Sequence, residues 1–133
     1  MTMHEFKDLV RHVMTTLPPE IAAHTKNLVV DVAREPSVRL LERAGFTDEE
    51  IEAGHTLLGL FESMPVPGRS SLDIEDQPNR LYIFKDPHED EFPDPRQLRI
   101  EIRKTVIHEL AHHFGFSEDD LAKWDANPEP FHD

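Results

Sequence analysis

The sequence predicts a single domain that combines amphipathic helices with a few short strands. Apolar residues recur at helical spacing near both ends of the chain, and short β-branched or aromatic runs lie between them. With 133 residues, the chain is long enough for one modest hydrophobic core and too short for a separate large substrate domain. We expect one domain over residues 1–124 and a flexible tail over 125–133, which contains Pro128 and Pro130.

The N-terminal part of the chain is predicted to contain a helix, a short helical turn and a strand. Residues 4–17 carry apolar side chains at helical spacing, and the pair Pro18-Pro19 stops that helix. Residues 20–24 predict a short helical turn. The β-branched run 28–33 that follows predicts a strand.

The middle of the chain is predicted to be less regular. Residues 36–44 predict an amphipathic helix that ends at Gly45, and Thr47 is suited to cap another short turn. A strand is expected over residues 57–62. The segment 64–77 predicts a loop, because it is rich in Pro, Ser and Asp.

The C-terminal half carries the clearest patterns. Residues 80–85 form the best strand pattern, and residues 86–95, dense in Pro and acids, predict a loop. A long helix is expected from about Pro95 to Phe114, because proline suits a first helical turn. Its apolar residues recur at helical intervals and predict a buried face made by Leu98, Ile102, Val106, Ile107, Leu110, Ala111 and Phe114.

The most specific feature is the run from His108 to His112, which has the form HExxH and is followed by Gly115. On an α-helix, side chains at positions i and i+4 lie roughly 40° apart, so both imidazoles project from one face at a spacing that can hold one metal ion. Glu109 stands beside that ion, where its carboxylate can deprotonate a metal-bound water. The motif therefore predicts a zinc site on the long helix.

A third ligand is needed, because catalytic zinc takes three protein ligands and keeps one position open for water. The acids Glu118, Asp119 and Asp120 follow Gly115, whose tolerance of the left-handed conformation lets the backbone reverse toward the metal. Glu118 is our first choice, Asp119 the second and Asp120 the third. The same acids also suit the first turn of a last helix with Ser117 as its N-cap and Trp124 near its end, so the cap and ligand roles overlap.

Other polar side chains have suitable chemistry, but we expect ordinary roles for them. Tyr82 is expected to be a core phenol, His88 a loop residue and Arg103 a solvated cation, so none is assigned to the site. His113 points about 100° away from His112 around the helix, which predicts a surface or supporting position.

Composition and charge narrow the possible partners. The chain has no Cys, which excludes disulfides and thiolate ligands. Its 27 acidic residues against 14 Lys and Arg give a formal net charge of −13, which would repel nucleic acid and favours basic or neutral substrates. Residues 1–16 lack the apolar run of a signal peptide, and no segment approaches the length of a membrane span. We expect a cytoplasmic protein with no membrane partner.

The run HELAHHFGFSEDD, from His108 to Asp120, resembles the zincin metallopeptidases and is similar to small single-domain bacterial proteins with a minimal zincin core. A weaker resemblance covers most of the chain, from about Phe6 to Trp124. It implies an α+β fold with a small mixed sheet packed on helices. It also implies a zinc ion held by both motif histidines and an acidic residue after Gly115, with Glu109 as general base.

Two features depart from the larger metzincins. All four methionines precede the motif, so no Met turn follows it. The position of their third histidine is occupied here by Glu118. A two-histidine, one-carboxylate set also suits iron(II), but the glutamate between the histidines favours zinc.

The sequence leaves three functions open. The first is a zinc peptidase acting on a peptide or protein substrate, which it would hold as an added strand along a sheet edge formed by residues 57–61 or 81–84. The second is a metal-binding regulatory or interaction protein without significant peptidase activity. The third is a metal-free domain with a coincidental motif. Glu109 favours catalysis, because a structural zinc site does not need it.

Overall fold

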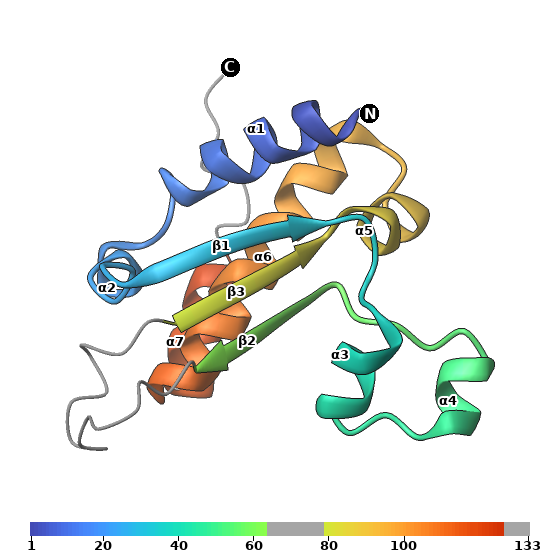
Figure 1. Ribbon diagram of the computed structural model, residues 1–133. Helices are drawn as coiled ribbons and strands as arrows, with labels where there is room; N and C mark the ends of the chain where they lie inside the picture. Colours follow the sequence, from blue (N-terminus) through green and yellow to red (C-terminus); the bar gives the residue numbers. More distant parts are fainter. Residues whose placement is uncertain (64–78, 127–133) are drawn as a thin grey trace.

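The computed structural model describes residues 1–63 and 79–126, in which three strands form a mixed sheet with helices packed on one face and along its β1 edge (Figure 1). The strands are β1 (Leu28–Ala33), β2 (Gly59–Ser63) and β3 (Asn79–Phe84), and their order in the sheet is β1-β3-β2. β1 pairs with β3 in parallel, whereas β2 pairs with β3 antiparallel. β3 is therefore the central strand, while β1 and β2 form the two edges.

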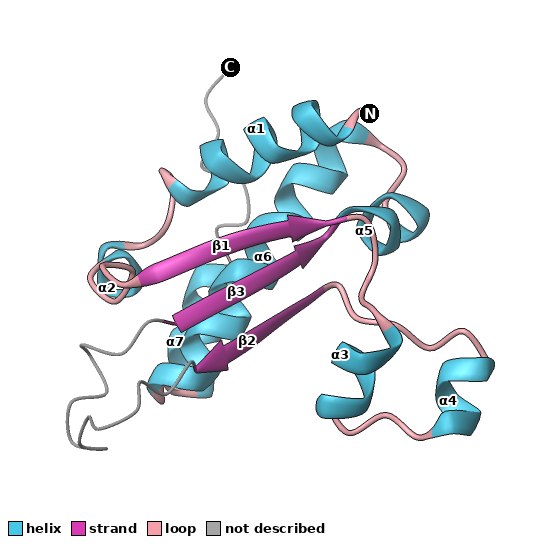
Figure 2. Cartoon of the chain, viewed as in Figure 1, coloured by secondary structure: helices cyan, strands magenta, loops and turns pink. Residues whose placement is uncertain are grey.

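Helix α6 (Pro95–Phe114) crosses one face of this sheet and organises the core (Figure 2). It begins and ends where the sequence predicted, with the Asp94 side chain accepting a hydrogen bond at its N-terminus. Leu81 and Ile83 of β3 are fully buried on the same face of the sheet. The predicted apolar face of the helix is confirmed, with Phe114 partly buried and the other six residues buried: Leu98, Ile102, Val106, Ile107, Leu110 and Ala111. Each large aliphatic side chain contributes about 1.5–3 kcal/mol by this burial.

Helix α1 (Met3–Met14) packs beside α6 and buries Phe6, Val10 and Val13. A capping box between Thr2 and Glu5 fixes its start, because each residue satisfies a backbone N–H of the other. The helix predicted over 4–17 is confirmed, although it ends three residues earlier than expected.

Three more short helices follow the predicted pattern. α2 (Pro19–Ala22) confirms the turn expected over 20–24. α3 (Val38–Arg43) and α4 (Asp48–Glu52) lie together beyond one end of the sheet (Figure 1), capped by Ser37 and Thr47. The predicted helix over 36–44 and the predicted Thr47 cap are both confirmed.

The loop predicted over residues 86–95 is wrong, because most of this segment forms helix α5 (Lys85–Glu91). Pro87 lies in the first turn, where a missing N–H costs no helical hydrogen bond. Lys85 and Glu89 also form an ion pair across one turn at 3.0 Å. Proline and acids are common in loops and equally suited to a helix start, so composition alone misassigned the segment.

His88 of α5 is a core residue and not the loop residue expected from the sequence, since its side chain is fully buried. Its Nδ1 lies 2.8 Å from the Phe84 carbonyl, which can only accept a hydrogen bond, so Nδ1 carries the proton. Nε2 lies 3.0 Å from Oγ1 of Thr105 on α6. The imidazole thereby ties the end of β3 to α6.

Arg103 is also buried, so its expected role as a solvated cation is wrong. Its guanidinium donates to the Thr16 carbonyl at 3.0 Å and thereby joins α6 to the segment that follows α1. Tyr82 is only partly buried and stacks on Phe84 with ring centroids 6.0 Å apart. The central part of α6 is thus held by polar contacts as well as by the apolar core.

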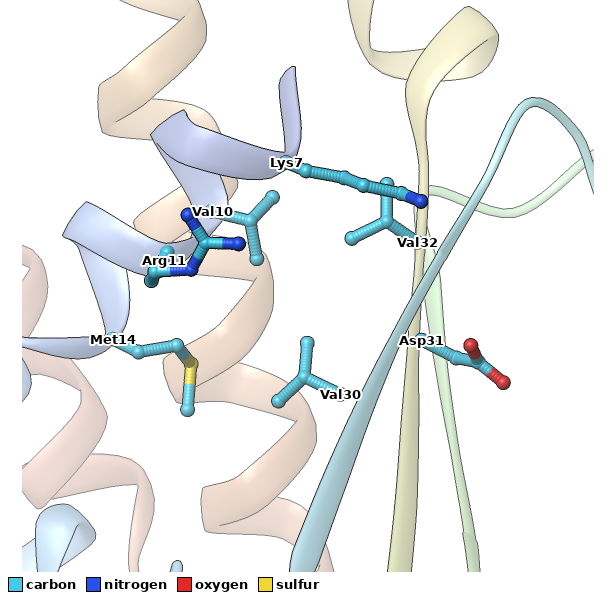
Figure 3. Close-up of a pocket in the computed structure, with 7 residues that line it drawn as sticks. All are labelled: Lys7, Val10, Arg11, Met14, Val30, Asp31 and Val32. Atoms are coloured by element: carbon cyan, nitrogen blue, oxygen red, sulfur yellow. The ribbon is translucent and has the colours of Figure 1, made fainter. Parts of the chain in front are cut away.

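The β1 edge of the sheet is flanked by α1, with a cleft of about 370 Å³ between them (Figure 3). Val30 and Val32 point toward α1 in this view, whereas Asp31 points away and lies 3.3 Å from Arg80. The side chains that α1 contributes are Lys7, Val10, Arg11 and Met14. Asp31 is the one carboxylate among these lining residues, and one carboxylate beside two cations makes no metal-ligating set.

The C-terminal helix α7 (Glu118–Asp125) packs against α6. Asp125 is the last residue of this helix, whereas the sequence predicted that it would be the first residue of the tail. The loop predicted over 64–77 and residues 127–133 of the expected tail lie outside the described residues. Within the described parts of the chain, no helix is both long and apolar enough to span a bilayer.

Burial lowers the pKa of His88, and this makes a testable contribution to stability. A histidine whose pKa is lower in the folded state binds fewer protons when folded, so its stabilising contribution is complete above the unfolded pKa, about 6.5, and is lost below it. We expect the urea midpoint of the wild type to fall more between about pH 7.5 and about pH 5.5 than that of His88→Gln. An equal pH dependence of the two midpoints would contradict this.

Candidate metal centre

An open cleft of about 460 Å³ lies between α6 and the start of strand β2, and the two histidines and the glutamate of the HExxH motif line one wall. α6 contributes Glu101, Lys104, Thr105, His108, Glu109 and His112. The opposite wall is formed by the residues that lead into β2 and begin it: Thr56, Leu57, Leu58 and Gly59. The cleft therefore sets the motif against one edge of the sheet.

His108 and His112 project from neighbouring turns of α6, as the motif spacing predicts. Their ring centroids are 6.1 Å apart and the rings are inclined at 69°. The His108 side chain is 35% exposed, and His112 is exposed. Both imidazoles are therefore accessible from the cleft, and His112 has room to turn.

Glu109 lies half-buried between α6 and β2. Burial raises the pKa of its carboxyl group, while a hydrogen bond from the backbone of Phe61 and the charges of His112 and His108 act in the opposite direction. A carboxylate with a raised pKa is a stronger base, so its environment suits proton transfer nearer neutral pH.

The pairing of β2 with β3 explains why the Phe61 N–H is available to Glu109. In an antiparallel pair, residues that bond to the partner strand alternate with residues whose N–H and C=O face away. The Phe84 N–H donates to the Leu58 carbonyl at 3.0 Å, so Leu58 is a bonded position. Phe61, three positions later, therefore faces the free edge, where its N–H orients the Glu109 carboxylate.

Gly59 allows β2 to lie close to α6. A Cβ atom on Gly59 would stand 2.7 Å from Cγ2 of Thr105 and 2.9 Å from the carbonyl oxygen of Tyr82. Both separations are shorter than carbon atoms tolerate, and the second is to fixed backbone. The missing side chain therefore sets the separation of the two cleft walls one turn before the motif.

An aromatic contact fixes the middle of β2. The His113 ring packs on Phe61 with centroids 3.9 Å apart, and the Phe114 ring meets Phe61 edge-on at 6.1 Å. His113 is exposed, in keeping with its predicted surface position, and partial burial lowers its pKa. These rings hold the strand that positions the backbone beside Glu109.

The backbone reverses after the motif as predicted. Gly115 has a φ of 77°, the left-handed conformation that ends α6. Ser117 caps α7, and the Asp120 carboxylate returns a hydrogen bond to the Ser117 N–H at 3.2 Å. Asp120 therefore serves the helix cap. Glu118 and Asp119 are exposed in the same first turn.

Asp125 is the site residue that the sequence reading missed. Its two carboxylate oxygens lie 2.9 Å and 3.1 Å from Nε2 of His108. Residues seven positions apart lie about 20° apart around a helix, so Asp125 shares a face of α7 with Glu118, two turns further on. Extending the predicted last helix by one residue would have revealed this relationship.

The described residues provide zinc-type donor atoms without a preformed three-ligand site. Residues 1–63 and 79–126 contain no group of three or more His, Asp or Glu side chains arranged to hold a metal ion. The donor chemistry nevertheless fits zinc, because imidazoles and a carboxylate are its common ligands. The structure brings His108 and Asp125 into contact, places the His112 ring 6.1 Å from that of His108 and leaves Glu118 at the exposed helix start.

A family model described as a zincin-like metallopeptidase matches residues 25–127, well over half of the chain. The matched region includes the whole sheet, the cleft and α7. No curated protein matches the sequence significantly.

The narrow spacing at Gly59 predicts that Gly59→Ala destabilises the fold by about 1–3 kcal/mol, because the new methyl group overpacks the contact between β2 and α6. Urea unfolding of the metal-free chain measures this loss. Ser63→Ala, at the exposed end of the same strand, is the control and should shift stability by no more than about 0.5 kcal/mol. Equal stability of both variants would contradict the steric argument.

The raised pKa of Glu109 predicts that its charge opposes folding near neutral pH. A carboxyl group whose pKa is raised on folding stabilises the fold fully below its unfolded pKa, about 4.3, and loses that contribution as the pH rises through the folded pKa. We expect metal-free Glu109→Gln to melt about 2–4 °C above the wild type near pH 7.5, with the gap closing toward pH 4. Glu42→Gln, at an exposed position of α3, should show no such gap.

Proposed function

The chain belongs to the zincin-like metallopeptidase family, and from this membership we propose that it is a zinc-dependent peptidase. It hydrolyses peptide bonds through an activated water, with Glu109 as general base and His108 and His112 as two of the metal ligands. One observation carries the proposal: these three side chains line a single cleft whose opposite wall leads into an edge strand. A carboxylate of α7 supplies the remaining ligand.

In the proposed hydrolysis, the metal ligands, Glu109 and the Phe61 backbone have separate roles. A zinc ion bound here lowers the pKa of a coordinated water and polarises the scissile carbonyl. Glu109 accepts the proton of the attacking water on a carboxylate oxygen and passes it to the nitrogen of the leaving amine. The Phe61 N–H holds this carboxylate at the cleft, and partial burial raises its pKa, which makes it a stronger base.

The substrate is a peptide held in an extended conformation along β2. Of the two edges considered from the sequence, residues 81–84 lie in the central strand and have no free edge, which leaves β2. Gly59 faces this edge in the same alternation as Phe61, so its N–H and C=O are available for pairing with an added strand. Backbone pairing of this kind accepts many sequences.

A regulatory metal-binding role is the alternative, and the contact between His108 and Asp125 favours it, because a metal there would link α6 to α7. A structural zinc site is closed by four protein ligands, however, and needs no base. Glu109 at the cleft therefore supports catalysis over the structural role.

Glu109→Gln separates the two functions. For a peptidase, we expect this variant to keep about one zinc per chain and to lose about 10²–10⁴-fold in hydrolysis of a fluorogenic peptide library. Elemental analysis by mass spectrometry measures the metal and also distinguishes zinc from iron. His112→Ala is the matched variant that should lose metal and activity together. Full activity of Glu109→Gln, or a zinc-loaded wild type that cleaves no peptide, would refute the proposal.

A further inference from the structure

We propose that the cleft between α1 and β1 binds a small amphiphilic anion, an aliphatic chain that ends in one carboxylate (Figure 3). This cleft lies at the β1 edge of the sheet. None of its lining residues that the structure describes also lines the cleft of the HExxH motif. The proposal is therefore independent of the metal centre and of the proposed peptidase activity.

Aliphatic side chains face this cleft from both walls. The residues that α1 contributes are spaced by three and four positions, which places them on one face of the helix. Val30 and Val32 lie two positions apart on β1, so both point toward α1. Packing of α1 on α6 buries Val10, but the two strand valines stay only partly buried. They provide apolar surface that a hydrocarbon chain can cover.

One unpaired cation stands at the cleft. Arg11 already pairs with the Asp8 carboxylate at 2.7 Å. Asp31 points away from the cleft and lies 3.3 Å from Arg80. The Lys7 ammonium forms no ion pair or hydrogen bond with the other residues that the structure describes. One uncompensated positive charge matches one negative charge on the ligand, and therefore a carboxylate in preference to a doubly charged phosphate.

The cleft has a charged end and an apolar end. In Figure 3, the Lys7 side chain extends from α1 across to Val32, whereas Met14 faces Val30 further along the cleft. With a rise of 1.5 Å per residue, Lys7 and Met14 are separated by about 10 Å along the helix axis. A carboxylate beside Lys7 thus directs its aliphatic chain past Val10 toward Met14.

The volume of the cleft sets the length of the chain. At roughly 30 Å³ for each water-sized group, about 370 Å³ holds about twelve heavy atoms. Decanoate, with ten carbons and two oxygens, has this size. Hexanoate leaves the Met14 end of the cleft empty. Because each CH₂ fully removed from water strengthens binding about three- to fourfold, affinity rises with chain length up to about ten carbons.

Isothermal titration calorimetry with decanoate tests the proposal on the metal-free whole chain at about pH 7.5, where the carboxylate is ionised. The metal-free chain offers the carboxylate no metal ion to bind. We expect decanoate, kept below its micelle concentration, to bind at least about tenfold more tightly than hexanoate.

A charge reversal at the cleft tests the role of the lysine. We expect Lys7→Glu to weaken decanoate binding at least about tenfold, because repulsion replaces attraction. Lys123→Glu on α7 changes the net charge equally and should alter the affinity by no more than about twofold. Circular dichroism shows whether both variants are folded.

Methyl NMR spectra locate the bound chain. We expect decanoate to shift the methyl signals of Val30, Val32 and Met14 and to leave those of Leu57 and Leu58, beside the motif, unchanged. No binding up to about 5 mM decanoate would overturn the proposal. Equal affinities of the wild type and Lys7→Glu, equal affinities for the two acids, or shifts confined to Leu57 and Leu58 would also overturn it.

Discussion

The close packing of β2 against α6 is the constraint on which the candidate site depends. Gly59 permits this approach at one end of the strand, and the Phe61 ring anchors the middle of the strand on His113 and Phe114. Because the spacing is fixed at these two points, the Phe61 N–H meets the Glu109 carboxylate. A strand edge and a helix motif thereby act as one unit, although they come from segments about fifty residues apart.

This arrangement has an energetic cost at Glu109. A half-buried carboxylate loses hydration, and one backbone hydrogen bond offsets only part of that loss, so the pKa rises. The same partial dehydration strengthens the base. The large core around α6 supplies the stability that tolerates an unfavourable group at the cleft, since buried side chains from three helices and β3 surround it.

The elements with local signals were predictable, and those set by long-range packing were not. α6 has a proline in its first turn and a left-handed glycine at its end, so its bounds follow from the sequence. The order of the strands depends on pairing between β1 and β3, which no local pattern encodes. His88 and Asp125 were missed for the same reason, because their roles arise only when α5 and α7 pack on α6.

Charge around the cleft indicates how a metal ion and the fold support each other. Asp125 contacts His108, and Glu109 and Glu101 line the same cleft as the motif histidines. The Lys104 ammonium lies 3.9 Å from the Glu101 carboxylate. In a chain with a formal net charge of −13, these carboxylates repel one another when no cation is bound. A divalent ion bound at the motif histidines, as proposed, would offset that repulsion. Its binding free energy would then add to the stability of the helices that form the site.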